Sequence, residues 1–187
     1  MSKVIKLKKG LDIKLNGEAE KVVQSAGTIS SCALKPTDFR LLTPKLAVKV
    51  GDAVKAGDVL FIDKLHPEIK FTTPVSGTIQ AINRGERRKL LEVVVKADAE
   101  TQYRDFGKSG LSQLNRDEVI NRLLDSGAWP LIKQRPYDII ADPMVTPKAI
   151  FVSAFDSAPL APDYDFILHG QEKALQAGFD CLQKLCH

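Results

Sequence analysis

The sequence predicts a mixed α+β fold, in which a small domain of short strands precedes the opening of an α/β domain. Two Gly-Asp steps, Gly51-Asp52 and Gly57-Asp58, stand six residues apart. Glycine permits the backbone angles of a tight corner and aspartate bonds its own backbone there, so only short strands fit between such corners. From about Thr28 to Ala97 the apolar residues fall in short strand-like runs, whereas helical periodicity begins after residue 112.

The strand-rich part has a recognisable layout. An apolar run, Val59 to Ile62, leads into a polar hairpin, and Pro74-Val75-Ser76-Gly77 opens another strand. After the basic loop Arg84–Lys89, a last strand around Val94 closes the domain. This order of corners, hairpin and Pro-x-x-Gly resembles the lipoyl/biotinyl-like barrel-sandwich hybrid, here over residues 28–98. Such a resemblance implies either a carrier of a swinging prosthetic group or a rigid docking module.

The carrier alternative depends on Lys64. In lipoyl and biotinyl domains the modified lysine occupies a hairpin tip before the Pro-x-x-Gly strand, and Asp63-Lys64 is similar. However, Lys64 lies ten residues before Pro74, which is longer than that pattern, and the hairpin contains His66 and Pro67. It also lacks the Met-Lys-Met of biotin carriers. We therefore favour a solvated lysine over a modified one.

The second half predicts helices and strands in alternation. Residues 99–112 are polar and are expected to be a linker. A helix is predicted over Asn115–Ser126, with Asn115 and Glu118 as a capping box and Gly127 as its stop. Further elements are two buried strands and a final helix, expected at Tyr137–Ala141, Ala149–Phe155 and Gly170–Leu185.

This order predicts that residues 113–187 begin a Rossmann-like domain. Two strands and two helices do not complete a doubly wound sheet, so we expect the chain to be the N-terminal part of a longer polypeptide. The preceding residues 1–27 are polar, and the alternation of Leu11, Ile13 and Leu15 there predicts a half-buried strand.

Composition narrows the class of function. The 187 residues are 44% hydrophobic and 27% charged, which is typical of a soluble globular protein. No apolar run approaches the ~20 residues of a membrane helix. Cys32, Cys181 and Cys186 lack the spacing of a metal site, and the net charge of +4 without a recognition motif argues against nucleic acid.

A nucleotide site is not expected either. Dinucleotide binding needs a glycine-rich turn after a strand, where bare N–H groups meet phosphate. After the predicted strand Ala149–Phe155 the chain instead carries two prolines and two aspartates between Asp156 and Asp163. Prolines remove donors and aspartates repel phosphate, so we predict no NADH binding by this chain.

Four segments together resemble one family: KLKKGLDIKLNGEAE, FTTPVSGTIQAINRGERRKLLEVVV, LLDSGAWPLIKQRPYD and PKAIFVSAFDSAPLAPD. They are similar to the N-terminal part of the NqrA family, the A subunits of the sodium-translocating NADH:quinone oxidoreductase, and the resemblance covers nearly the whole chain. The related electron-transport protein RnfC shares the barrel and is the alternative. RnfC has a glycine-rich nucleotide loop and cysteine clusters, and neither occurs in this sequence.

The resemblance implies a peripheral subunit on the cytoplasmic side of a bacterial inner membrane, within a translocase that oxidises NADH, reduces ubiquinone and exports sodium. Flavins and iron–sulfur centres are expected on other subunits, and no cofactor on this chain. The implied partners are the other subunits, especially the adjacent membrane subunit, and ubiquinone. The family supplies no catalytic residue for this chain, so none is assigned.

Two sets of residues are candidates for binding. A quinone needs apolar walls and a donor to its carbonyls, which suggests Trp129, Phe151 and Phe155 as walls and Arg135 as the donor. The alternative is that the phenylalanines belong to the core of a strand and Trp129 packs a loop. The second set, Arg84, Arg87 and Arg88, is expected to face acidic loops or lipid headgroups.

Overall fold

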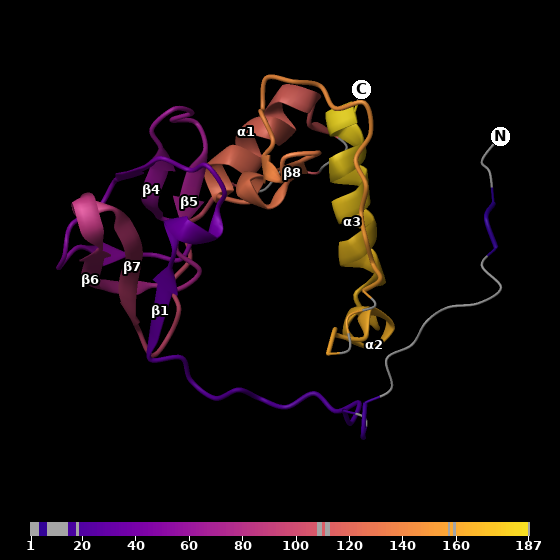
Figure 1. Cartoon of the computed structure of the whole chain (residues 1–187), viewed down its shortest axis with the longest axis horizontal. Helices are drawn as coiled ribbons and strands as arrows, with labels where there is room; N and C mark the ends of the chain where they lie inside the picture. The colour runs from indigo at the N-terminus through magenta and orange to yellow at the C-terminus, as the bar shows by residue number, and fades with distance from the viewer. Residues whose placement is uncertain are drawn as a thin grey trace.

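The computed structural model describes residues 4–6, 15–17, 19–107, 110, 113–156, 158 and 160–186, and confirms the mixed α+β fold with a barrel-sandwich domain first (Figure 1). Two antiparallel sheets form this domain. One has the order β1-β7-β6-β3, with β1 Ser31–Leu34, β3 Ala53–Val54, β6 Gly77–Arg84 and β7 Leu90–Ala97. The other has the order β2-β4-β5, with β2 Pro44–Leu46, β4 Val59–Asp63 and β5 Lys70–Thr72. Short 3-10 turns, η1 Pro36–Asp38 and η2 Glu86–Arg88, join β1 to β2 and β6 to β7.

The two Gly-Asp corners form as predicted. Gly51 and Gly57 have φ angles of 92° and 98°, which side chains rarely tolerate. In each corner the aspartate side chain accepts a hydrogen bond from the backbone three residues earlier: Lys49 N donates to Asp52 over 2.8 Å, and Lys55 N donates to Asp58 over 2.7 Å. The corners therefore hold β3 between two fixed turns.

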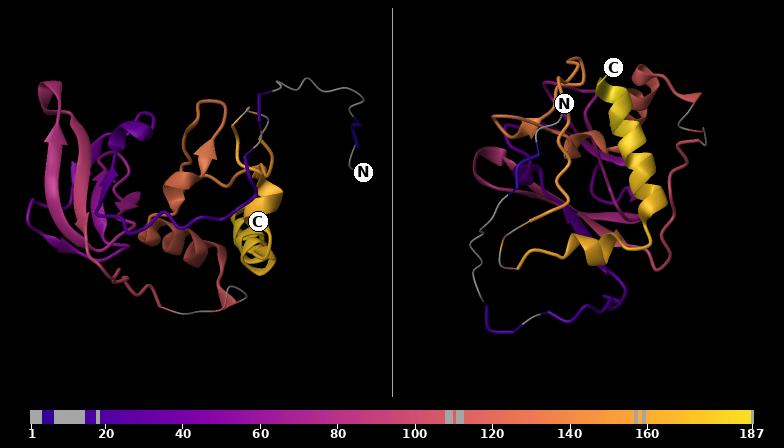
Figure 2. Two further views of the ribbon diagram at one scale, coloured as in Figure 1. Left: turned by 90° about the horizontal axis from the view of Figure 1, so that it is seen from below. Right: turned by 90° about the vertical axis from the view of Figure 1, so that its right-hand side faces the viewer.

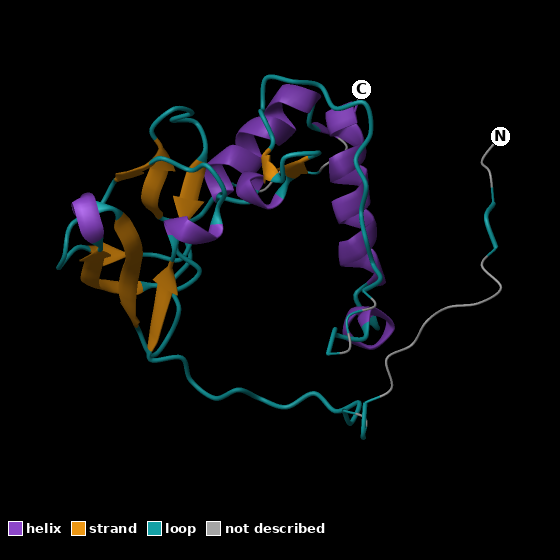
Figure 3. Cartoon of the chain, viewed as in Figure 1, coloured by secondary structure: helices purple, strands orange, loops and turns teal. Residues whose placement is uncertain are grey.

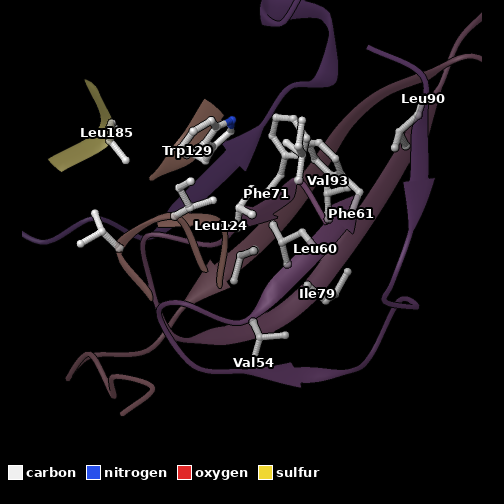
Figure 4. Packing of buried hydrophobic residues seen from close by; sticks show 14 residues of the cluster. Val54, Leu60, Phe61, Phe71, Ile79, Leu90, Val93, Leu124, Trp129 and Leu185 are labelled. Carbon is white, nitrogen blue, oxygen red and sulfur yellow. The ribbon is translucent and has the colours of Figure 1, made fainter. Parts of the chain in front are cut away.

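The hydrophobic core lies between the two sheets. Leu60, Phe61 and Phe71 from one sheet meet Ile79 and Val93 from the other (Figure 4). The rings of Phe61 and Phe71 are stacked with centroids 4.8 Å apart. Period-two alternation along β6 and β7 explains this, since every second residue of a half-buried strand faces the core.

The residues directly after β7 remain in contact with the barrel. Ser76 Oγ donates to Asp98 over 2.9 Å and accepts from Gln102 N over 2.9 Å. Ala56 N donates to Gln102 O, and Arg104 N donates to Ala56 O, both over 2.8 Å. The first part of the predicted 99–112 segment is therefore held against the barrel like a short extra strand, and residues 108, 109, 111 and 112 lie outside the described residues.

Helices form most of the regular structure in the second part of the chain, and long loops connect them, as Figure 3 shows. Helix α1, Arg116–Ser126, confirms the predicted helix: Asn115 and Glu118 exchange both capping-box hydrogen bonds, and Gly127 ends it with φ 75°. The remaining elements are η4 Trp129–Leu131, β8 Lys133–Gln134, β9 Ile139–Ile140, α2 Tyr164–Leu168, α3 Glu172–Gln183 and η5 Lys184–Cys186. Helix α3 confirms the predicted last helix.

The two predicted buried strands are corrected. The first survives only as the two-residue β9, which pairs with β8 in a small hairpin. The second, Ala149–Phe155, has no strand structure, and Phe151 and Phe155 are exposed. An apolar run forms a buried strand only where neighbouring strands accept its backbone hydrogen bonds, and no strand of the described chain pairs with this segment.

Helix α1 packs against the barrel at the edge of the three-stranded sheet. Val119, Ile120 and Leu124 of α1 belong to the same buried cluster as Phe71 of β5. Thr72 Oγ1 donates to Ser126 O over 3.0 Å, and Lys70 forms an ion pair with Asp125. The helix thereby covers an edge strand that would otherwise expose its free side. Two views of this junction appear in Figure 2.

An extended segment, residues 19–30, connects the barrel to the far end of the second part. It runs from β1 towards α2 without regular structure (Figure 1). Lys21 Nζ lies 2.6 Å from Asp163 Oδ2, at the residue that caps α2. Most of the predicted N-terminal strand, including Leu11 and Ile13, lies outside the described residues. Within the described ranges, no helix has both the length and the apolar character needed to cross a membrane.

Candidate functional site

A hollow of about 300 Å³ lies between the barrel and the β8–β9 hairpin. Three segments that are distant in the sequence form it: residues 40–42 after η1, the turn between β4 and β5, and the β8–β9 hairpin with the residues after it. Its walls are mostly aliphatic, with polar groups from a few side chains. The lining residues that matter below are Arg40, Leu42, His66, Ile69, Gln134 and Ile140.

The barrel side of the hollow is held by a network of backbone hydrogen bonds. The buried carboxylate of Asp63 accepts from Leu65 N over 3.0 Å, and Ile69 N donates to His66 O over 2.9 Å. Lys64 N donates to Thr43 O over 2.8 Å, which ties the turn to the chain leading into β2. The turn is therefore fixed, and it directs Leu65 and His66 to the hollow.

The opposite wall is fixed by Trp129. Its indole Nε1 donates to Ala141 O over 2.8 Å, and Ala141 lines the hollow. Gln134 and Ile139 are register partners in the β8–β9 hairpin, and both line the hollow. The buried indole thus holds the end of β9 in place without entering the hollow itself.

The arrangement suits a small, largely apolar ligand that carries hydrogen-bond acceptors. A volume of about 300 Å³ lies at the lower end of the range for ligand sites, ~300–1,000 Å³. The guanidinium of Arg40 and the amide of Gln134 can donate to carbonyl oxygens, while Leu42 and Ile140 supply apolar contact. Among the described residues no group of three or more His, Cys, Asp or Glu side chains is placed to hold a metal ion.

A second hollow, of about 450 Å³, lies between the segment 19–30 and α2. Val23 and Phe166 are its apolar residues, beside Lys21, Asp165 and His169. The hydrogen bond from Lys21 lowers the pKa of the neighbouring Asp163 carboxyl, with help from the backbone of Phe166. Three of its five lining residues are ionisable, against four of thirteen in the first hollow, so we favour the first hollow as the ligand site.

The four residues predicted to face a quinone are placed apart from the first hollow. Trp129 is only 4% exposed and its N–H is engaged, whereas Phe151 and Phe155 are 94% and 79% exposed in a segment without regular structure. Arg135 is exposed and lies 3.6 Å from Asp138. None of the four lines the hollow.

The three arginines predicted to form an interface lie together at the β6–β7 turn. Arg84, Arg87 and Arg88 are all exposed, and Arg84 Nη1 donates to Arg88 O over 3.0 Å. Lys64, the carrier candidate, is also exposed at the turn between β4 and β5.

The lining residues Arg40, Leu42 and Gln134 are not among the residues predicted from the sequence. No local pattern marks them, because Arg40 and Leu42 follow η1 whereas Gln134 belongs to β8, and these two distant segments meet only in the folded chain. The insertion of His66 and Pro67 in the hairpin was the one available signal, since it lengthens the turn that faces the second part of the chain.

The fold and the hollow define a class: a barrel-sandwich hybrid packed against α1, which opens an α/β segment. Residues 5–98 match the family described as the NqrA N-terminal barrel-sandwich hybrid domain, and residues 114–187 match the NqrA second alpha/beta domain. The chain therefore belongs to the NqrA family.

Curated relatives align with this chain over almost its whole length. The A subunit of the Na(+)-translocating NADH-quinone reductase from Pseudomonas aeruginosa strain PAO1 is 39% identical over 184 residues, and that from Aliivibrio salmonicida is 38% identical. The protein of the same name from Psychromonas ingrahamii is 36% identical. Each alignment covers 97% of this chain and 41% of the relative, so the chain spans about two fifths of the length of these relatives.

Proposed function

We propose that this chain is part of a peripheral subunit of a sodium-translocating NADH–quinone reductase, on the cytoplasmic side of a bacterial inner membrane. In this proposal the complex couples NADH oxidation and ubiquinone reduction to sodium export, with flavins and iron–sulfur centres on other subunits. The chain itself contributes docking and a quinone-binding surface rather than catalytic groups. Membership of the NqrA family supports this assignment over an RnfC-like protein.

The quinone headgroup is proposed to occupy the hollow between the barrel and the β8–β9 hairpin. The observation that carries this proposal is the lining: aliphatic side chains with Arg40 and Gln134 as donors, in a volume that fits one substituted ring. The two carboxylates of the lining, Asp63 and Asp142, each accept a backbone hydrogen bond. A quinone carbonyl only accepts hydrogen bonds, so donors amid apolar walls complement it. No electron transfer is assigned to the side chains of this chain.

The fluorescence of Trp129 provides a direct test, because it is the one tryptophan of the chain and it bonds to the hollow wall at Ala141. Ubiquinone-1 is an electron acceptor that should quench its emission saturably. Arg40→Met should weaken this binding by about tenfold, the effect of one lost hydrogen bond. Arg135→Met is the matched control, since Arg135 does not line the hollow, and it should leave the affinity unchanged.

Two results would contradict the quinone proposal. Quenching that stays linear in ubiquinone-1 indicates collisions rather than a site. An affinity lowered by Arg135→Met but not by Arg40→Met places the quinone elsewhere on the second part of the chain.

A carrier function remains the second candidate because Lys64 is exposed at the tip of the β4–β5 hairpin. The intact mass of the purified chain separates the two candidates. An unmodified mass after co-expression with biotin and lipoyl ligases supports the docking function, whereas one added lipoyl or biotinyl group on Lys64 supports a carrier.

A further inference from the structure

The turn between β6 and β7 concentrates positive charge at one exposed tip. Within six residues it carries four cations: Arg84, Arg87, Arg88 and Lys89. The nearest carboxylates in sequence are Glu86, on the tip, and Glu92, which accepts a hydrogen bond from Asn83 over 2.7 Å. In the part of the chain that the structure describes, none of the four cations forms an ion pair.

The backbone of this tip is held in a costly conformation. Arg87 and Arg88 have φ angles of 53° and 61°, in the left-handed region that favours glycine or asparagine. The turn is closed by Gly85 N donating to Lys89 O over 2.8 Å and by Lys89 N donating to Glu86 O over 3.1 Å. Strained residues persist where the surrounding structure holds them. The tip therefore displays its arginines from a fixed backbone.

The position and the composition of the tip indicate which kind of anionic partner it binds. It projects from the end of the barrel away from α1 and α3 (Figure 1), and the described hollows lie elsewhere. The residues that hold most of the binding energy in protein interfaces are Trp and Tyr as well as Arg, and residues 84–89 offer no aromatic or aliphatic side chain beside their arginines. A layer of phosphate groups needs no such anchor, and guanidinium groups bind phosphate bidentately.

We propose that the tip formed by residues 84–89 binds the anionic headgroups of phospholipids. The inference rests on the proposed function, because it gives a membrane-associated protein its contact with the lipid surface. It also gives a reason for arginine at two positions where the backbone favours glycine or asparagine.

Vesicle flotation of the full chain tests this proposal, with phosphatidylcholine vesicles compared with vesicles containing phosphatidylglycerol. The variant R87N/R88N removes two charges and keeps residue types that tolerate left-handed angles. The matched control K49N/K55N removes two exposed charges from the Gly-Asp corners. Each cation near an anionic surface contributes about fivefold in binding, so R87N/R88N should weaken binding about 25-fold and the control less than fivefold.

Three results would overturn the proposal: no preference for anionic vesicles, equal loss in both double variants, or unchanged vesicle binding by R87N/R88N. If that variant keeps vesicle binding but loses co-purification with other subunits in detergent, the tip contacts an acidic protein surface instead. Thermal unfolding of each variant checks that the fold is retained. The quinone titration is done without vesicles, so the quinone proposal and the lipid proposal can fail separately.

Discussion

Gly127 and Thr72 lie in direct contact where α1 meets the barrel: a Cβ added to Gly127 would stand 2.3 Å from Thr72 Oγ1. The same threonine donates its hydroxyl to Ser126 O. Glycine at position 127 therefore has two roles. It ends α1 in the left-handed conformation, with φ 75°, and its lack of a side chain lets α1 approach β5 closely. This junction also brings together the two walls of the hollow.

Gly127→Ala should destabilise the chain by about 2–4 kcal/mol, since it adds left-handed strain to an overpacked contact. Urea denaturation followed by circular dichroism measures the free energy of unfolding. Thr72→Ala removes two of the three atoms nearest to the added Cβ, so the double variant should lose less than the sum of the single variants. If Gly127→Ala lowers the free energy of unfolding by less than about 1 kcal/mol, the close contact between Gly127 and Thr72 is not needed for stability.

Apolar packing, rather than the ion pair, should dominate the stability of this junction. Leu124 is buried against the barrel, so Leu124→Ala should cost about 2–5 kcal/mol. The side chains of Lys70 and Asp125 are 32% and 55% exposed, so Asp125→Asn should cost less than about 1 kcal/mol. Urea denaturation compares the two neighbouring substitutions directly, and a larger loss for Asp125→Asn would reverse this ranking.

The sequence predicted those parts of the fold whose signals are local. The Gly-Asp corners, the capping box of α1 and its glycine stop are each complete within a few residues, and the structure confirms them. The segment 149–155 was wrongly predicted as a strand, because β-structure depends on neighbouring strands that a local pattern does not reveal. The hollow could not be predicted because it appears only after Gly127 allows α1 to dock.

Cys181 should react slowly with thiol reagents at neutral pH. It packs against the buried cluster, and this burial raises the pKa of its thiol, partly offset by the charge of Lys184. At neutral pH, Cys181 therefore has a smaller fraction of reactive thiolate than an ordinary cysteine, whose pKa is about 8.5. The rise of its alkylation rate with pH should occur at a higher pH than for an ordinary cysteine. Peptide mass spectrometry after timed iodoacetamide treatment measures this rate. The chain in concentrated urea is the control, and equal pH profiles in the two states would disprove the effect of burial.

The contact of the segment 19–30 with α2 should persist in mild acid. Hydrogen bonds from Lys21 and the backbone of Phe166 lower the pKa of Asp163. Its carboxylate therefore stays charged at pH values below the ordinary aspartate pKa of about 3.9. The charged carboxylate of Asp163 therefore stabilises the contact at every pH above the ordinary aspartate pKa. This stabilisation is lost only as the pH falls through the lowered pKa of Asp163. Carbon-detected NMR of the Asp163 carboxyl follows the titration. Lys21→Met should move its midpoint back towards the ordinary value, and an unchanged midpoint would show that Lys21 has no part in the shift.

Hydrogen exchange in the presence of ubiquinone-1 tests the central claim of a quinone-binding hollow most directly. Saturating quinone should slow amide exchange in peptides that span residues 63–69 and 139–145, which form the two walls. Exchange should stay unchanged at the Gly51 and Gly57 corners and at the β6–β7 tip. If protection is absent, or is confined to the exposed segment around Phe151 and Phe155, the hollow is not the quinone site.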